Sequence, residues 1–312
     1  MIKLIIKTFL LLITVFIFSC EPERNQNIDD TITIDSTKID RKVLIIGIDG
    51  FRSDAMQENI SPFIYNLTQH NNVYYNLNHI TEDITYSGPN WSSILTGVHM
   101  NKHNVTDNSF DNSNYNDYPP FFAYVERANS DINTASVVNW TPINSYTTSN
   151  YTDFAPVESM NDSIVFEQTK AMLLNSTPLD ADVIFIQFDE LDGAGHAYGF
   201  HPSIIEYTST VNKLDSYSET LFNIIEDKRL NGEDWIYMIV SDHGGEGTGH
   251  GDATNLNISR TIFLTEHPSE SFLASCCYVS SQVDLVPTIF NFLGISSTKF
   301  ESDKDGTSII NP

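Results

Sequence analysis

Acidic and imidazole side chains in this sequence collect near the ends of short apolar runs. Six of them are far apart along the chain and are accompanied by glycines: Asp49, Asp192, His196, Asp242, His243 and His250. Carboxylates and imidazoles are groups with which proteins bind divalent transition metals, and nearby glycines allow the backbone to approach closely. The joint pattern therefore predicts a site for divalent metal ions.

A serine that could act as a nucleophile lies in a separate polar element, residues 85–91, just before the apolar pair Ile94 and Leu95. Taken singly, each motif also has a structural explanation. An aspartate at a strand end commonly caps a helix, glycine-rich loops are often turns, and Ser87 before Gly-Pro is most simply a structural residue. It is their combination at several strand ends that indicates chemistry.

Apolar runs rich in β-branched residues predict strands that are buried on both faces of a parallel sheet. The runs are Val43–Ile48, Thr134–Val138, Asp182–Phe188, Trp235–Val240 and Thr261–Leu264. Amphipathic stretches predict helices. These are Ile60–His70, Ser163–Leu174, Ile204–Asp227 and Ser281–Leu293, the last ended by Gly294.

This alternation predicts an α/β fold with a doubly wound, mostly parallel central sheet and helices on both faces. Ligands bind beyond the carboxyl ends of the strands in such sheets, so the six donors are expected to meet there. Two stretches without periodicity, the Asn- and Asp-rich Val105–Tyr118 and residues 140–160, are expected to form loops over the same face.

Composition narrows the choice of partner. The chain has 312 residues, 16 Lys and Arg against 41 Asp and Glu, and a net charge of −25. Such a surface repels nucleic acid and anionic lipid, so binding to a nucleic-acid duplex is not expected. An anionic substrate would need a local positive centre, which these side chains supply poorly.

The N-terminus predicts export. Lys3 and Lys7 precede the apolar run Phe9–Phe18, which is too short to span a bilayer and is typical of a signal peptide. Cys20 directly after Ser19 makes residues 1–19 similar to a bacterial lipoprotein signal, which implies a lipid-anchored protein of the cell envelope. Ordinary secretion is the alternative.

The segments that follow the signal complete the predicted organisation. The polar residues 20–41 predict a tether, and residues 42–312 a single folded domain that begins near Lys42. Cys276 and Cys277 are neighbours that rarely bridge each other, and we expect them to pack as small apolar groups.

Four motifs occur in the order found in the alkaline phosphatase superfamily. They are Asp49-Gly50-Phe51-Arg52, Ser87-Gly88-Pro89-Asn90, Asp192-Gly193-Ala194-Gly195-His196 and Asp242-His243-Gly244. The chain resembles most closely the type I phosphodiesterase/nucleotide pyrophosphatase branch, over roughly residues 43–294. No single motif is specific, but together they are.

The resemblance implies a role for each motif residue. Asp49, Asp242 and His243 would hold one metal ion, and Asp192, His196 and His250 the other. Ser87 would lie between the two ions as the nucleophile and contact them. Asn90 would donate a hydrogen bond to a phosphoryl oxygen. Zinc is the usual metal of such sites, and manganese is the alternative.

The implied metal ions would supply the local positive charge that an anionic substrate needs. Two divalent ions bring four positive charges, and the three aspartates bring three negative charges. An ionised Ser87 balances the one positive charge that remains. Phosphomonoesterases of the superfamily use an arginine to bind the doubly charged phosphate. No arginine lies in a matching motif here, although Arg52 and Arg260 are conceivable. Trp91 stands where sulfatases require arginine, which disfavours sulfatase activity.

The resemblance therefore implies metal-dependent hydrolysis of phosphate esters, with phosphodiesters favoured, through a phosphoserine intermediate. The alternatives are a phosphomonoesterase, a transferase that moves a phosphoryl-linked headgroup to a glycan or lipid, and a non-catalytic lipid-anchored binding protein. The expected substrate is a small phosphate ester or a lipid or glycan carrying one.

Overall fold

The structure is a computed structural model that describes residues 30–311. The predicted signal peptide and the first part of the predicted tether lie outside the described residues. Within residues 30–311, no helix combines the length and apolarity that crossing a membrane requires.

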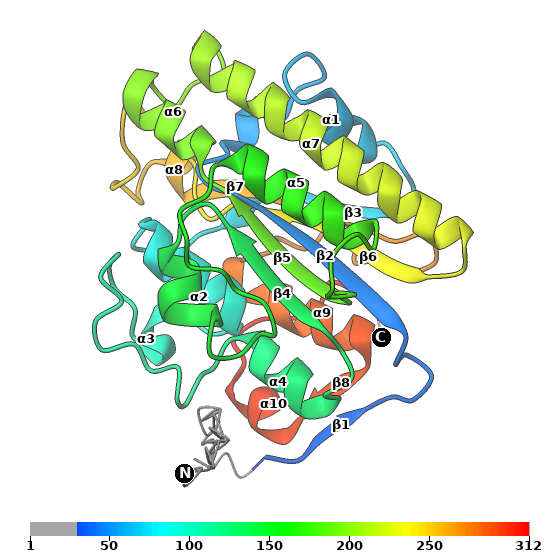
Figure 1. Cartoon of the computed structure of the whole chain (residues 1–312). Coiled ribbons are helices and arrows are strands. Elements are labelled where there is room, and N and C mark those ends of the chain that lie inside the picture. The colour runs from blue at the N-terminus through cyan, green and yellow to red at the C-terminus, as the bar shows by residue number, and fades with distance from the viewer. Residues whose placement is uncertain (1–29, 312) are drawn as a thin grey trace, which may run out of the picture.

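A mixed sheet forms the centre of the described part of the chain (Figure 1), with the strand order β3-β7-β6-β2-β5-β4. These strands are β2 (Arg41–Ile48), β3 (Val73–Ile80), β4 (Thr134–Val138), β5 (Val183–Phe188), β6 (Asp234–Val240) and β7 (Arg260–Glu266). Strands β4, β5, β2 and β6 are parallel to one another, whereas β7 is antiparallel to β6 and β3 is antiparallel to β7. The predicted α/β class and mostly parallel sheet are confirmed.

Helices cover both faces of this sheet (Figure 1). On one face lie α1 (Pro62–Leu67), α5 (Asp162–Leu173), α6 (Glu190–Tyr198) and α7 (Ile205–Leu230). On the other lie α2 (Ser87–Thr96), α3 (Met100–His103), α4 (Phe121–Ala128), α9 (Leu285–Leu293) and α10 (Thr298–Asp303). Alternate strand residues enter two separate apolar cores; Ile46 and Ile48 pack under α7, while Val43 and Ile45 pack under α9. This division is the doubly wound arrangement.

The local sequence explains how the long helices form and end. Along α7, Tyr207, Val211, Leu214 and Leu221 are fully buried, which is the apolar stripe that the spacing predicts. Helix α9 ends at Gly294, whose φ of 70° lies in the left-handed region that favours glycine. A short 3-10 turn, Gln282–Asp284, leads into α9 and accounts for the start of the predicted Ser281–Leu293 helix.

Strand β3 was not predicted, because polar residues interrupt its apolar pattern. Asn76 and His79 are buried, and each has hydrogen-bond partners in the segment that covers this edge of the sheet. Asn76 donates to the carbonyl of Tyr278 at 2.9 Å, and the His79 ring lies 2.8 Å from Ser280 Oγ. Burial of satisfied polar groups hides a strand from a hydrophobicity pattern.

The folded part begins earlier than the predicted start near Lys42. Strand β1 (Ile32–Ile34) pairs antiparallel with β8 (Ile295–Ser297), and the N–H of Asp35 donates to the carbonyl of Gly294 at 2.9 Å. The last part of the predicted tether is therefore part of the fold. Such short strands carry too few residues to show a period in the sequence.

The two predicted loops differ in structure. Residues 105–118 contain neither helix nor strand, as expected, whereas residues 140–160 include a π-helix, Ile143–Thr148. Tyr115 joins the two segments to α2, because its hydroxyl lies 2.7 Å from Ser92 Oγ and 3.0 Å from Thr147 Oγ1. Cys276 and Cys277 are exposed free cysteines, so the expectation that they pack as small apolar groups is wrong.

Candidate active site

The sheet order brings the predicted donors to one edge. Asp49 follows β2, Asp242 and His243 follow β6, and Asp192 and His196 lie on α6, which follows β5. Strands β5, β2 and β6 are parallel neighbours, so their carboxyl ends meet. The donors therefore come together from segments that are far apart in the sequence, as the fold class predicts.

Asp49, Asp242 and His243 form the first donor group, with one donor atom of each within 4.8 Å of the others. The Nε2 atom of His243 lies 3.3 Å from Asp49 Oδ1 and 3.4 Å from Asp242 Oδ2. All three side chains are fully buried. This is the set predicted to hold one metal ion.

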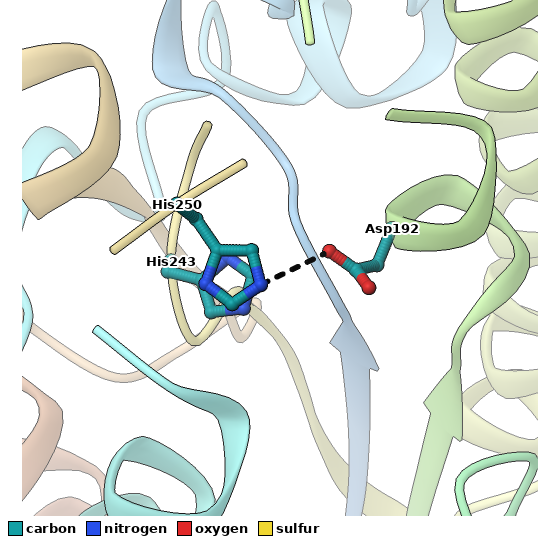
Figure 2. A group of neighbouring side chains, drawn as sticks. All are labelled: Asp192, His243 and His250. Carbon is teal, nitrogen blue, oxygen red and sulfur yellow. Dashed lines mark ion pairs between the residues drawn. The ribbon is translucent and has the colours of Figure 1, made fainter. Parts of the chain in front are cut away.

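The second predicted set also comes together. The Nε2 atom of His196 lies 3.3 Å from Asp192 Oδ2 and 3.2 Å from His250 Nε2. In Figure 2 the rings of His243 and His250 overlap, and Asp192 faces them from α6. The two rings are stacked with centroids 3.8 Å apart, and His243 also groups with Asp192 and His250. His243 thus lies between the two predicted metal positions.

Backbone carbonyls set the orientation of all three imidazoles. The Nδ1 atoms of His196, His243 and His250 lie 2.7–2.9 Å from the carbonyl oxygens of Thr248, Gly244 and Thr85, respectively. A carbonyl only accepts hydrogen bonds, so each Nδ1 carries the proton in this arrangement. Each Nε2 lone pair is then available to a metal ion on the site side.

The three aspartates each leave one buried oxygen without a partner. Within residues 30–311, Asp49 Oδ1, Asp192 Oδ1 and Asp242 Oδ2 are buried and accept no hydrogen bond. Burial raises the pKa of all three carboxyls, and for Asp192 and Asp242 the neighbouring carboxylates raise it further. Buried carboxylate oxygens without partners are unfavourable unless a cation compensates them.

These features fit divalent metal ions. Unpartnered carboxylate oxygens and imidazole Nε2 atoms are the ligand atoms of zinc and related ions. Burial also lowers the pKa of His243 to about 4 and that of His250 to about 3, so both rings are neutral at neutral pH and keep the lone pair that a metal requires.

Ser87 lies beside the donors. It is the first residue of α2, and its Oγ is 3.4 Å from His243 Nε2. The positive end of the helix dipole therefore meets the place where an anionic substrate would approach the hydroxyl. The structure thus brings the predicted nucleophile to the six predicted donors.

The predicted role of Asn90 is not supported by its contacts. Its Oδ1 accepts from the N–H of Glu82 at 2.9 Å, and its Nδ2 donates to the carbonyls of Ile84 and Tyr86 at 3.0 and 2.9 Å. Both hydrogens of the amide are thus used inside the protein, which leaves none for a phosphoryl oxygen. We call residues 81–86 the strap. Asn90 fixes this strap, whose Thr85 carbonyl orients His250.

A different asparagine has a free amide near Ser87. Asn108 accepts from the N–H of Gly88, the residue after Ser87, at 2.8 Å. Its Nδ2 makes no hydrogen bond with any residue between 30 and 311. A Cβ on Gly88 would lie 2.6 Å from the Asp107 carbonyl oxygen, so glycine is required for this close approach. The sequence indicated only an Asn- and Asp-rich loop here.

The two arginines named as candidates to bind phosphate form contacts with other groups. Arg52 forms ion pairs with Asp54 and Glu246 at 2.6 and 3.2 Å and donates to two backbone carbonyls. Arg260 donates to the carbonyl of Ser259 at 2.8 Å. Among the described residues, no lysine or arginine forms an ion pair with Asp49, Asp192 or Asp242.

Comparison with known proteins agrees with this geometry. The family model for type I phosphodiesterase / nucleotide pyrophosphatase matches residues 43–261. The chain belongs to this family. Membership confirms the resemblance to the phosphodiesterase branch. All six predicted donors fall within the matched range.

Curated relatives have low identity. The human bis(5'-adenosyl)-triphosphatase ENPP4 is 24% identical over 227 residues, which cover 67% of this chain and 48% of the relative. The ENPP4 of Bos taurus is 25% identical over 222 residues, which cover 65% of this chain and 47% of the relative. The chain thus spans about half the length of the curated relatives it matches.

Solved structures share the fold. Murine ENPP5 in complex with AMP has a TM-score of 0.64 at 13% identity and covers 87% of this chain and all of that one. The lipoteichoic acid synthase LtaP from Listeria monocytogenes has a TM-score of 0.63 at 13% identity, covering 89% and 79%. The periplasmic domain of EptC from Escherichia coli, solved with Zn, has a TM-score of 0.59 at 14% identity, covering 87% and 86%.

The contacts of Asn90 lead to a testable prediction. Asn90→Ala removes three hydrogen bonds from the strap and should lower the free energy of unfolding by about 1–3 kcal/mol. Because the strap orients His250, zinc affinity should also fall. Urea unfolding and chelator competition measure these effects, with the exposed Asn66→Ala as control. A lower kcat with zinc affinity and stability unchanged would instead support the predicted contact with substrate.

Proposed function

We propose that this chain hydrolyses phosphodiesters through Ser87, beside two divalent metal ions. One observation carries the proposal: three carboxylate oxygens without partners in residues 30–311 and three oriented imidazole Nε2 atoms converge from different segments beside one hydroxyl. A non-catalytic binding protein would not need the hydroxyl in that place. The family membership supports the same reaction class.

Six residues would hold the two ions. Asp49, Asp242 and His243 surround one position, and Asp192, His196 and His250 surround the other. When bound, the ions would lower the pKa of the Ser87 hydroxyl and offset the charge of the phosphoryl oxygens. Mixed carboxylate and imidazole donors favour zinc, with manganese as the alternative. The fold relative EptC was solved with Zn.

The protein's own groups then carry the transfer. Ser87 Oγ releases its proton to solvent and forms a bond to phosphorus while the bond from phosphorus to the leaving oxygen breaks; that oxygen keeps the electron pair and takes a proton from solvent. Water then attacks phosphorus and the bond to Ser87 Oγ breaks, so that one proton of the water passes through solvent to Oγ, the hydroxyl of the water remains on phosphorus, and the phosphate product is released. Asn108 Nδ2 is the chain's available neutral donor for a phosphoryl oxygen near Ser87, in place of Asn90.

No guanidinium of residues 30–311 pairs with the aspartates of the site, which favours diesters over monoesters. A phosphomonoester carries about one more negative charge than a diester at neutral pH. Arg52 and Arg260 are bound to other groups, and no other cationic side chain in residues 30–311 pairs with the aspartates. The lower charge of a phosphodiester matches this site better.

We further propose that the protein is exported and lipid-anchored in the cell envelope, where it would meet small phosphate esters or lipid and glycan headgroups. This proposal rests on the sequence of residues 1–20. Fractionation of cells that express the full chain tests it. Wild-type protein should be recovered with membranes and Cys20→Ser protein should not; equal recovery with membranes would refute the lipid anchor.

The main experiment measures turnover of bis(4-nitrophenyl) phosphate and 4-nitrophenyl phosphate with added zinc. We expect the diester to be the better substrate and a chelator to abolish turnover. Ser87→Ala should lose on the order of 10³-fold or more in kcat while zinc binding is retained. No turnover of either ester by zinc-loaded wild type would end the proposal.

Two controls sharpen this test. Ser53→Ala removes a hydroxyl near the same sheet edge that forms no part of the proposed site, so its activity should equal that of wild type. Addition of acceptor alcohols with product analysis separates hydrolysis from headgroup transfer. If the main product is the alcohol carrying the phosphoryl group, the protein is a transferase and not a hydrolase.

Asn108→Ala tests the reassigned donor. The variant should lose about 10²–10³-fold in kcat, because a donor to the developing charge is removed. Zinc affinity should stay unchanged, since Asn108 contacts none of the six donors. Asn116→Ala, an exposed residue of the same loop, is the matched control. Wild-type kcat in Asn108→Ala would exclude the assignment.

A further inference from the structure

The carboxylate of Asp49 is held on one side only. Its Oδ2 accepts from Trp91 Nε1 at 2.9 Å and from Gln187 Nε2 at 3.1 Å. Its Oδ1 accepts no hydrogen bond from residues 30–311 and faces His243 Nε2 at 3.3 Å. One oxygen is thus tied to the protein, and the other is directed at the first metal position.

The orientation of Gln187 is determined by a third group. Its Oε1 accepts from the backbone N–H of Trp140 at 2.9 Å. A backbone N–H only donates, so the oxygen of this amide must face Trp140 and the NH₂ must face Asp49. Gln187 is fully buried on β5, next to β2, and its Nε2 also donates to Asp189 Oδ1 at 3.2 Å.

The position of Trp91 depends on Gly47 of strand β2. A Cβ on Gly47 would lie 2.5 Å from Trp91 Cη2, so the indole reaches Asp49 only because β2 has glycine at this point. The Trp91 ring also packs edge-on against Phe185, with centroids 5.8 Å apart, and is 1% exposed. Packing on both sides prevents the indole N–H from turning away.

We propose that Trp91 and Gln187 are positioning residues that present Asp49 to a metal ion through Oδ1 alone and thereby set the affinity of the first metal position. The inference rests on the proposed metal-dependent function. Outer hydrogen bonds fix the orientation of a ligand, and their loss typically costs metal affinity. Both donors are neutral, so they orient the carboxylate without cancelling the charge that a cation requires.

The test compares variants that remove one donor each. Trp91→Phe keeps the aromatic packing but lacks the N–H, and Gln187→Met keeps the length but lacks the amide. We expect each to weaken zinc binding by about 10–100-fold, measured by competition with a chromogenic chelator. Trp235→Phe is the matched control, because its Nε1 binds Glu233 at 2.9 Å, at the opposite end of the sheet.

A positioning role also predicts rescue. Neither residue would touch substrate, so saturating zinc should restore most of kcat in both variants, which a disordered site would not permit. Wild-type zinc affinity in either variant, with the fold intact by circular dichroism, would overturn the inference. If wild type itself binds no zinc, the proposed function fails first, and the two failures are distinguishable.

Discussion

Three buried carboxylate oxygens without hydrogen-bond partners in residues 30–311 determine the design of this molecule. Burial raises the pKa of Asp49, Asp192 and Asp242, and the neighbouring carboxylates raise that of Asp192 and Asp242 further. A fold that holds such groups together has to do so with rigid elements. Here each aspartate lies at or just beyond the end of a parallel strand in the middle of the sheet, where apolar packing on both faces prevents the groups from moving apart.

Five of the six donors have one atom bound to the protein and another atom free. Every imidazole has its Nδ1 against a backbone carbonyl, and Asp49 has its Oδ2 against two N–H groups. Asp242 follows the same pattern, since its Oδ1 accepts from the N–H of Gly50 at 3.3 Å and from that of His243 at 3.0 Å. The partners of these five donors are neutral, so they orient Asp49 and Asp242 without reducing the negative charge of either carboxylate.

The parts predicted from the sequence are those with a local signature. Strands such as Val183–Phe188 are buried on both faces, so they appear as apolar runs, and donors that directly follow such strands could be predicted with them. β3 lacked this signature because Asn76 and His79 are buried with polar partners. The two asparagines near Ser87 could not be distinguished, because the partners that occupy one amide and leave the other free are set by the folded chain.

The motif that contains Ser87 therefore combines two functions within a few residues. Ser87 faces the donors at the first turn of α2, while Asn90, one turn later, holds the strap that lies before the helix. The strap reaches His250 through the carbonyl of Thr85, and His250 stacks on His243, which contacts the Ser87 hydroxyl. Contacts therefore link α2 to the strap, the strap to His250, His250 to His243, and His243 back to Ser87 on α2. A displacement of the strap would shift a metal donor, so the spacing of serine and asparagine is a mechanical requirement even though Asn90 has no free hydrogen for a substrate.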